Sequence, residues 1–210
     1  VYNRALGYLR TQIVQIKGLK DPQIINQQAF LLYVLSRSGK PDVSSTVQLY
    51  DQRQRMALYG RAFLAETLFA IDPSDPRIKT LLSDFIDSAI LSATGSHWEE
   101  TQADRFNWNT DTRTTAIVLS ALIHLDPKNP LTINAVRWLM SNRTEGRWKG
   151  TQETSWTLMA LTRWMAESGE LDANFEYAVA LDGDRLLGRV VSNKNMLETI
   201  DLQVVVSRLL

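Results

Sequence analysis

Apolar residues recur at helical spacing from residue 1 to about residue 169. A first stripe covers residues 1–16 and is interrupted only by Gly7. A second helix is predicted over residues 27–38, and polar residues 39–45, rich in turn and cap types, end it. Further helices are predicted from about Ser45 and over residues 56–71. The pattern is therefore one helix after another.

Two connectors, residues 72–76 and 126–130, share the order Asp-Pro-x-(Asp/Asn)-Pro. The early proline of each stops the preceding helix, because it disfavours helical backbone in the residue before it. Asp75 and Asn129 are predicted N-caps, and the proline after each suits the first helical position. Each connector therefore predicts a helix hairpin.

Four helical segments share one pattern: a small residue, two bulky or branched residues, an apolar residue, any residue, a small residue and Leu. They are residues 29–35, 62–68, 116–122 and 155–161. Helix repeats at such intervals indicate an array of helix pairs. Small residues allow close approach, so we expect these helices to form an inner ring, with helices over residues 78–90 and 131–141 outside it. The prediction is a mainly α fold, an α/α toroid of repeated helix pairs, with an open solenoid as the alternative.

The pattern changes after Gly169. Apolar and other residues alternate over residues 175–181, Asp182-Gly183 is a strong hairpin signal, and residues 186–191 provide a second strand. A third strand is predicted around Leu202, Val204 and Val206. We therefore expect a partial toroid over residues 1–172 and a short antiparallel β segment over residues 173–210. Because both ends interrupt an element, we interpret the sequence as a piece of a larger protein.

Composition removes several classes of function. The 23 basic and 23 acidic residues give zero net charge, which offers no reason to expect nucleic acid or an anionic membrane as a partner. There are no cysteines, so disulfides, thiolate metal sites and cysteine nucleophiles are excluded from this segment. No run of about 18 apolar residues is present, so we expect no membrane insertion by this segment.

Three separated segments, residues 106–116, 135–140 and 147–156, resemble the thioester domain of bacterial α2-macroglobulins. In the last, Thr151-Gln152-Glu153-Thr154 opens a helix and is similar to the Thr-Gln-(Asp/Glu/Ala)-Thr element of animal members and complement relatives. In this family the toroid is inserted into a CUB-type β-sandwich, so the resemblance implies that residues 173–210 are the first strands of that sandwich.

The resemblance implies a fragment of a broad-spectrum endopeptidase inhibitor, with proteases and other domains of the same chain as partners. Such a trap acylates a nucleophile of the attacking protease through a Cys–Gln thioester. The family's Cys-x-Glu-Gln motif would lie upstream of this segment, and residues 14–26 lack the histidine that complement members place near the thioester. We therefore predict no catalytic residue, cofactor or metal here and no enzyme activity. The implied location is extracellular or periplasmic, with any membrane anchor in parts not present here.

The two histidines, His97 and His124, are the candidate metal ligands. His97 lies in a loop beside acidic residues, and His124 is predicted near the end of a helix. A zinc site needs further ligands at workable spacing, and isolated ligands do not form one. The sequence therefore predicts no metal site.

Acidic and aromatic residues gather around residues 98–111, which leaves a carbohydrate-active enzyme as an alternative. Glycosidases place two carboxylates beside the scissile bond, and aromatic rings line their clefts. The candidates are Glu99, Glu100, Asp104, Asp111, Trp98, Trp108 and Trp148. The structural interpretation is that Asp111 and its threonine neighbours cap a helix, the carboxylates are solvated and the tryptophans pack loops. A terpene-cyclase-like toroid is a weaker alternative, because Asp111-Thr112 is a poor aspartate cluster.

The remaining tryptophans, Trp138, Trp156 and Trp164, fall on predicted helices and are interpreted as core residues. The Thr151–Thr154 stretch has two interpretations. It forms a surface facing the thioester, or it is simply a helix start in which Thr151 is the N-cap and Glu153 favours the first turn. A helical-repeat interaction module remains the third functional alternative.

Overall fold

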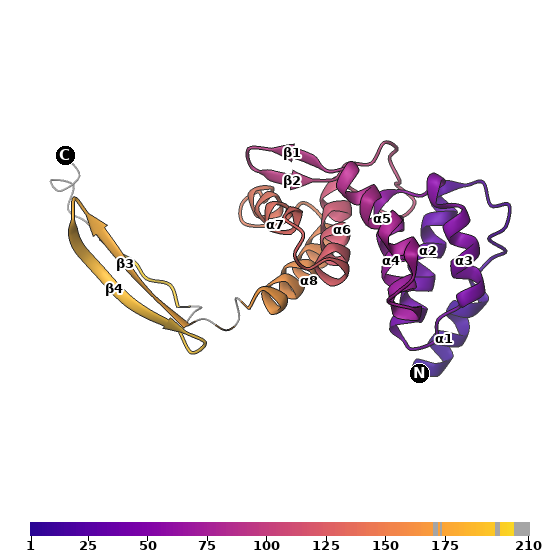
Figure 1. Ribbon diagram of the computed structural model, residues 1–210, viewed down its shortest axis with the longest axis horizontal. Helices are drawn as coiled ribbons and strands as arrows, with labels where there is room; N and C mark the ends of the chain where they lie inside the picture. The colour runs from indigo at the N-terminus through magenta and orange to yellow at the C-terminus, as the bar shows by residue number, and fades with distance from the viewer. Residues whose placement is uncertain (170–171, 173, 196–197, 204–210) are drawn as a thin grey trace. The chain divides into compact units, whose positions relative to one another are not determined.

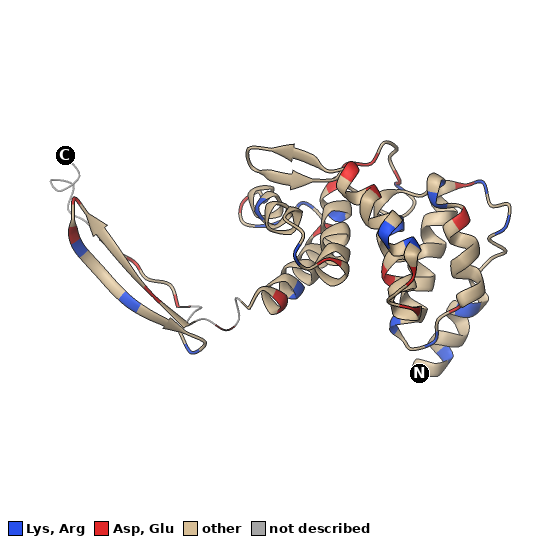
Figure 2. Ribbon diagram, in the orientation of Figure 1, with Lys and Arg blue, Asp and Glu red and all other residues tan. Residues whose placement is uncertain are grey.

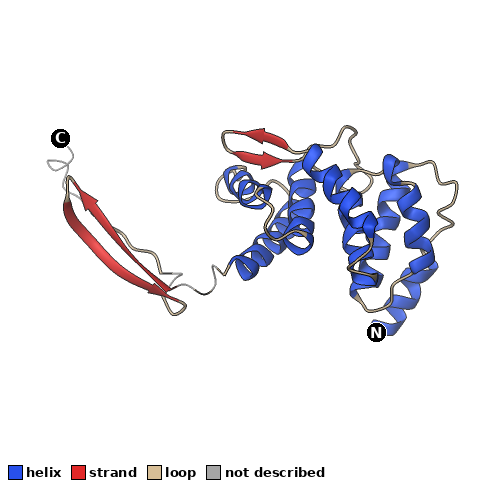
Figure 3. Cartoon of the chain, viewed as in Figure 1, coloured by secondary structure: helices blue, strands red, loops and turns tan. Residues whose placement is uncertain are grey.

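Helices dominate the computed structural model, which describes residues 1–169, 172, 174–195 and 198–203 (Figure 1). The chain divides into two compact units, Val1–Trp164 and Met165–Leu210. Figure 3 shows the helices in the first unit and the longer strands in the second. The helices are α1 (Tyr2–Thr11), α2 (Pro22–Arg37), α3 (Val43–Asp51), α4 (Leu58–Ile71), α5 (Pro76–Asp87), α6 (Asp111–Leu125), α7 (Leu131–Ser141) and α8 (Thr151–Ser168), with a 3-10 turn at Arg53–Arg55.

The four repeat segments lie on α2, α4, α6 and α8. Within the first unit α2 packs on α4, and α4 packs on α6. Nearly every residue of α4 between Tyr59 and Leu68 is buried, and the same is true of α6 between Thr112 and Ile123. In contrast, α5 and α7 bury a single face each, against α4 and α6 respectively. α2, α4 and α6 thus form an inner row that α5 and α7 cover, as the apolar pattern predicts, whereas α8 buries only Glu153, Thr157 and Ala160. Closure into a ring is not shown.

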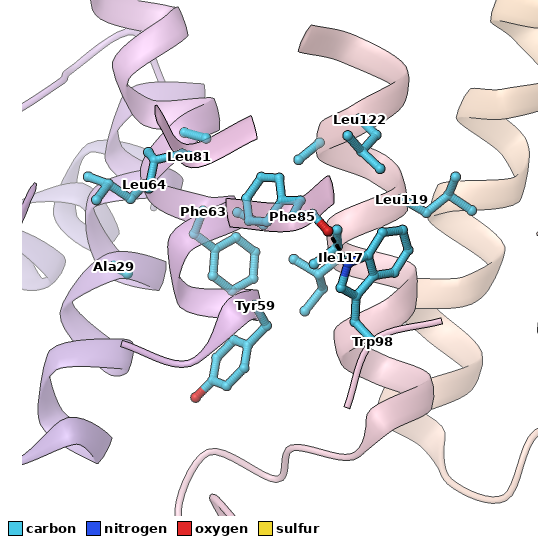
Figure 4. Packing of buried hydrophobic residues seen from close by; sticks show 14 of the residues in the cluster. Ala29, Tyr59, Phe63, Leu64, Leu81, Phe85, Trp98, Ile117, Leu119 and Leu122 are labelled. Carbon is cyan, nitrogen blue, oxygen red and sulfur yellow. Dashed lines mark hydrogen bonds between the residues drawn. The ribbon is translucent and has the colours of Figure 1, made fainter. Parts of the chain in front are cut away.

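The core lies between the helices of the inner row (Figure 4). Trp98 is fully buried there and donates its indole N–H to the Phe85 carbonyl at 2.7 Å. An aromatic cluster continues the core toward α8, where the rings of Phe63 and Trp156 lie 5.2 Å apart. Each buried aromatic side chain removes on the order of 150–250 Å² from water, so these rings supply much of the packing energy.

The first predicted helix is too long. α1 ends at Thr11, and residues 12–16 continue as a loop, although Ile16 is still buried. The Gln28 side chain holds this loop, because its Oε1 accepts from the Val14 N–H at 3.1 Å and its amide donates to the Gln12 carbonyl at 3.2 Å. The apolar stripe therefore extends past the end of the helix, because apolar residues of the following loop are also buried.

Two helices begin earlier than predicted, each at an aspartate cap. Asp21 accepts from the Gln23 N–H at 2.9 Å and starts α2 at Pro22, five residues before the predicted start. Asp42 accepts from the Ser45 N–H at 3.0 Å and starts α3 at Val43. In both cases the cap oxygen satisfies a helix N–H that has no partner within the helix.

The predicted N-cap of the first connector is confirmed, and that of the second is displaced by one residue. Asp75 caps α5, accepting from the Arg77 N–H at 2.9 Å. Asn129 accepts in the same way from the Leu131 N–H at 3.0 Å. However, α7 begins at Leu131, so Pro130 stands at the cap position and not at the first helical residue.

The predicted helix over residues 78–90 is wrong at its C-terminal end. α5 ends at Asp87, and the chain then forms a short hairpin, β1 (Ile90–Ser92) paired antiparallel with β2 (Gly95–His97). β2 packs on α7. Gly95 makes this approach possible, because a Cβ there would lie 2.2 Å from the Asn134 carbonyl oxygen and 2.9 Å from the Trp138 nitrogen.

We expect Gly95→Ala to lower the free energy of unfolding by about 2–3 kcal/mol. The Gly95 backbone has φ +138°, and the new methyl group would collide with the α7 backbone, so β2 must shift. Chemical denaturation followed by circular dichroism measures the change. Gly150→Ala is the matched control, because its Cβ would meet nothing within 4 Å. Equal stability of the two variants would contradict the close packing of β2 on α7.

The second unit contains the predicted hairpin, β3 (Asn174–Leu181) paired antiparallel with β4 (Asp184–Ser192). The turn residues Asp182 and Gly183 have φ of 52° and 90°, as a tight turn of the I′ type requires. The third predicted strand is not seen at Leu202, which lies outside any strand. Its other two residues, Val204 and Val206, lie outside the described part of the chain.

Candidate functional site

The acidic segment between β2 and α6 caps a helix that is distant in sequence. Glu100 accepts from the backbone N–H groups of Leu58 at 3.0 Å and Tyr59 at 3.2 Å, at the start of α4. It also accepts from the Thr114 hydroxyl at 2.9 Å. Burial raises the pKa of Glu100, and these hydrogen bonds act in the opposite direction. Its carboxylate is therefore a partly buried structural cap and not the solvated group expected.

Asp104 is the centre of a second buried network beside the first. Its Oδ2 accepts from the Tyr59 hydroxyl at 2.5 Å, from the Asn26 amide at 3.1 Å and from the Asn107 amide at 2.9 Å. Burial acts to raise the pKa of Asp104, but the hydrogen bonds outweigh it and hold the pKa below its ordinary value. The Asn26 Oδ1 also accepts from the Ala57 N–H at 3.0 Å, which completes the capping of α4.

A buried cation faces these acids. The Arg113 guanidinium lies over the Tyr59 ring, 4.8 Å from its centroid, and 5.8 Å from the Trp156 ring centroid. Its Nη1 donates to the Asn109 Oδ1 at 2.9 Å. Burial lowers its pKa, yet an arginine side chain stays protonated in proteins. Arg113 thereby partly balances the charges of the two networks, and it was absent from the sequence candidates because no motif marks it.

The remaining two acids have different surroundings. Asp111 is the first residue of α6, and Thr110 is its N-cap, accepting from the Arg113 N–H at 3.2 Å. Asp111 Oδ1 accepts from the Glu100 N–H at 3.1 Å. The prediction that threonine and Asp111 form a helix start is confirmed. Glu99 is more than half exposed, with Oε1 3.0 Å from the His97 ring.

A groove of about 720 Å³ is lined by three of these acids, Glu99, Glu100 and Asp104. None of its lining residues is a tryptophan. Trp98 is fully buried, and Trp148 is buried and donates its indole N–H to the Leu139 carbonyl at 2.9 Å. Glu100 and Asp104 are occupied as acceptors of structural hydrogen bonds. The groove therefore gathers three of the acidic candidates without the tryptophans, and Trp108, which is 75% exposed, does not line it.

The two histidines lie apart and have protein partners. The His97 ring stacks on Trp138, with centroids 4.5 Å apart and planes 2° from parallel. His124 lies in the last turn of α6, as expected, with Nδ1 2.8 Å from a carboxylate oxygen of Glu66. Among the described residues, no group of three or more His, Cys, Asp or Glu side chains is placed to hold a metal ion.

Glu66 centres an ion cluster that sequence reasoning missed. Its side chain on α4 is only 5% exposed, and its Oε1 lies 2.6 Å from Arg163 Nη1 on α8. The same Arg163 nitrogen donates to the Ser120 carbonyl on α6 at 2.9 Å. One carboxylate thus links α4, α6 and α8. The sequence does mark Glu66 in one way, because it is a charged residue within the otherwise apolar repeat segment 62–68. It stands at the one position where the repeat pattern allows any residue.

Charges of both signs are otherwise spread over the helices (Figure 2), which agrees with the zero net charge. No helix in the described part of the chain is long and apolar enough to cross a membrane.

No protein family matches the chain by sequence, and no curated protein does. Solved structures do match its fold, and two of them are described here. One is Salmonella α2-macroglobulin reacted with methylamine, with a TM-score of 0.61 and 16% identity over 92% of this chain. The other is native α2-macroglobulin from Escherichia coli, from domain MG7 to the C-terminus, with a TM-score of 0.61 and 13% identity over 90% of this chain. This chain has the fold of part of a bacterial α2-macroglobulin.

The shared part is a small fraction of each α2-macroglobulin. The chain covers 13% of the Salmonella chain and 29% of the Escherichia coli chain. The matched part of this chain thus corresponds to a segment of a much longer protein.

Within this α2-macroglobulin fold, the Thr151–Thr154 element opens α8. The helix includes Thr151 as its first residue, so the prediction that Thr151 is the N-cap is off by one residue. The Gly150 carbonyl accepts from both the N–H and the hydroxyl of Thr154, each at 2.9 Å. Glu153 lies in the first turn, as expected. Trp138, Trp156 and Trp164 all pack against the core, as predicted.

Proposed function

We propose that this chain is the later part of the thioester-type domain of an α2-macroglobulin-like protease trap. In this proposal residues 1–172 are part of an α/α toroid, and residues 173–210 are the first strands of a CUB-type β-sandwich. The observation that carries it is the fold match over 92% of the chain.

The chain's role in such a trap is structural. The thioester would lie upstream of Val1, and the segment supplies no reactive group of its own. The hydrogen bonds support this role, because Glu100, Asp104 and Glu66 are all engaged in joining helices. The parent protein would be an extracellular or periplasmic endopeptidase inhibitor, and this segment would contact other domains of its own chain.

Methylamine treatment of the full-length parent tests the proposal. A thioester is a better acyl donor than an amide, so methylamine should form a methylamide on a glutamine upstream of Val1 and release one thiol. Mass spectrometry of peptides and thiol titration measure the two products. Methylamide without a thiol, or neither product from protein shown to be intact, would contradict a thioester trap.

The 210-residue chain by itself provides a second test. It should neither inhibit an endopeptidase nor hydrolyse a glycan, because trapping requires the bait and thioester regions. Activity of this chain in either assay would overturn the proposed structural role.

A further inference from the structure

α8 is attached to the other helices by little buried surface. It has 18 residues and buries three of them, Glu153, Thr157 and Ala160, whereas the 15-residue α6 buries eleven. Leu158 and Met159 are both more than half exposed. α8 also has no backbone contact with another described helix as extensive as those that join α2, α4 and α6. Because the burial of apolar surface supplies most of the stability of a helix in a protein, α8 is the weakly held member of the set.

Two contacts on one side of α8 hold it in place. Trp156 and Arg163 are seven residues apart, which is about two helical turns, so they project from the same face. The Trp156 ring centroid lies 5.2 Å from that of Phe63 on α4 and 6.4 Å from that of Phe30 on α2. Arg163 pairs with Glu66 of α4 at 2.6 Å. The attachment of α8 thus depends chiefly on one aromatic and one ionic contact.

The docked position of α8 also leaves buried polar atoms without partners. Thr157 is fully buried, and its hydroxyl has no hydrogen-bond partner among the described residues. The same is true of the Nε of Arg113, whose guanidinium lies 5.8 Å from the Trp156 ring centroid. A buried polar group without a partner offsets part of what the surrounding contacts contribute, and water satisfies it once it is exposed. These two groups therefore favour release of α8.

We propose that α8 is a releasable strap, a helix that detaches as a unit while α2, α4 and α6 remain folded. Few buried contacts and low contact density are the properties of segments that open at a lower free energy than the whole fold. A threonine-rich helix of this length is marginal in water, so a released α8 loses its backbone hydrogen bonds.

The strap has a consequence for the connection between the two compact units. The boundary between the units falls inside α8, between Trp164 and Met165. Release of α8 therefore adds the docked part of the helix to the segment that joins them. The proposal goes beyond the proposed function, because it requires neither a thioester nor protease cleavage.

Native-state hydrogen exchange of the 210-residue chain, followed by NMR at low denaturant concentrations, tests the proposal. Amides of residues 155–164 should exchange about 100-fold or more faster than the slowest amides of α4 and α6. Their exchange should depend little on denaturant, because release of one helix exposes little surface, whereas exchange in α4 and α6 should depend on it steeply. Exchange of all three helices at one rate, with one denaturant dependence, would overturn the proposal.

Two substitutions separate release of α8 from unfolding of the whole unit. Ile78→Val removes one buried methyl group from α5, which packs on α4, and should speed exchange in α4 and α6 by about threefold to tenfold. It should leave exchange in α8 unchanged, because the contacts of Ile78 are the same whether or not α8 is docked. Thr157→Val removes the unpaired hydroxyl and keeps the side-chain shape, so it should slow exchange in α8 by about fivefold.

The matched control is Thr162→Val, since Thr162 is an exposed threonine on the same helix. It should change exchange in α8 by less than about twofold. Faster exchange of α8 in Ile78→Val, to the same degree as in α4, or unchanged exchange of α8 in Thr157→Val would each overturn the proposal. Because no step uses the thioester, a negative methylamine result would leave this test unaffected.

Discussion

Replacing Asp104 with alanine is expected to lower the free energy of unfolding by about 4 kcal/mol. Asp104 is 5% exposed and accepts from Tyr59, Asn26 and Asn107. The substitution leaves the buried Tyr59 hydroxyl without its acceptor and leaves Arg113 with less opposing charge. Denaturant titration at neutral pH measures the loss. A decrease below about 1 kcal/mol would contradict the network as a main source of stability.

The same carboxylate predicts a pH dependence. Because the pKa of Asp104 is lower in the folded than in the unfolded chain, its ionised form contributes stability at neutral pH. That contribution is lost as the pH falls below roughly 5 and through the lowered folded pKa. The stability difference between the unchanged chain and Asp104→Asn should therefore shrink with acidification. Asp51→Asn is the control, since Asp51 is exposed.

Glu66→Ala is expected to cost about 3–4 kcal/mol of unfolding free energy. The change removes the acceptor of Arg163 and the partner of His124, and it leaves a partly buried guanidinium beside the core. Arg163 is about one fifth exposed, so water recovers part of the loss. Denaturation of the purified variant measures it, with the exposed Glu167→Ala of α8 as the control.

A double variant separates the effect of the ion pair from that of the volume it fills. The pair Glu66→Met and Arg163→Met removes both charges and keeps apolar volume, so it should be more stable than Glu66→Ala. If the double variant were as unstable as Glu66→Ala, the loss would come from packing, and the electrostatic argument would be wrong.

Helix positions could be predicted where the cause is local. Asp75 and Asn129 accept from backbone N–H groups two residues away, and the small–bulky–Leu pattern predicts the inner position of α2, α4 and α6. The Asp182-Gly183 turn also depends on two adjacent residues. Periodicity reports burial, however, and Ile16 shows that a residue can be buried at helical spacing and lie beyond the end of its helix.

The arrangement around the acids could not be predicted, because its partners are far apart in sequence. Glu100 lies 42 residues from Leu58, and Asn26 lies 78 residues from Asp104. The sequence marks these residues as polar and near aromatics, which fits a cleft and a buried network equally well. Whether these acids line a cleft or form a buried network depends on which helix N-terminus the acidic segment between β2 and α6 contacts. The same holds for β2, whose place depends on the absence of a side chain at Gly95.

The capping of α4 by distant residues has a consequence for how the chain folds. Leu58 and Tyr59 obtain their acceptor from a residue about 40 positions later in the chain. A ribosome adds about 5–20 residues per second, so Glu100 is synthesised seconds after the start of α4. Until then its first turn has no partner beyond water and Asn26. The acidic segment therefore completes an earlier helix as it is synthesised, and it links formation of the second half of the unit to stability of the first.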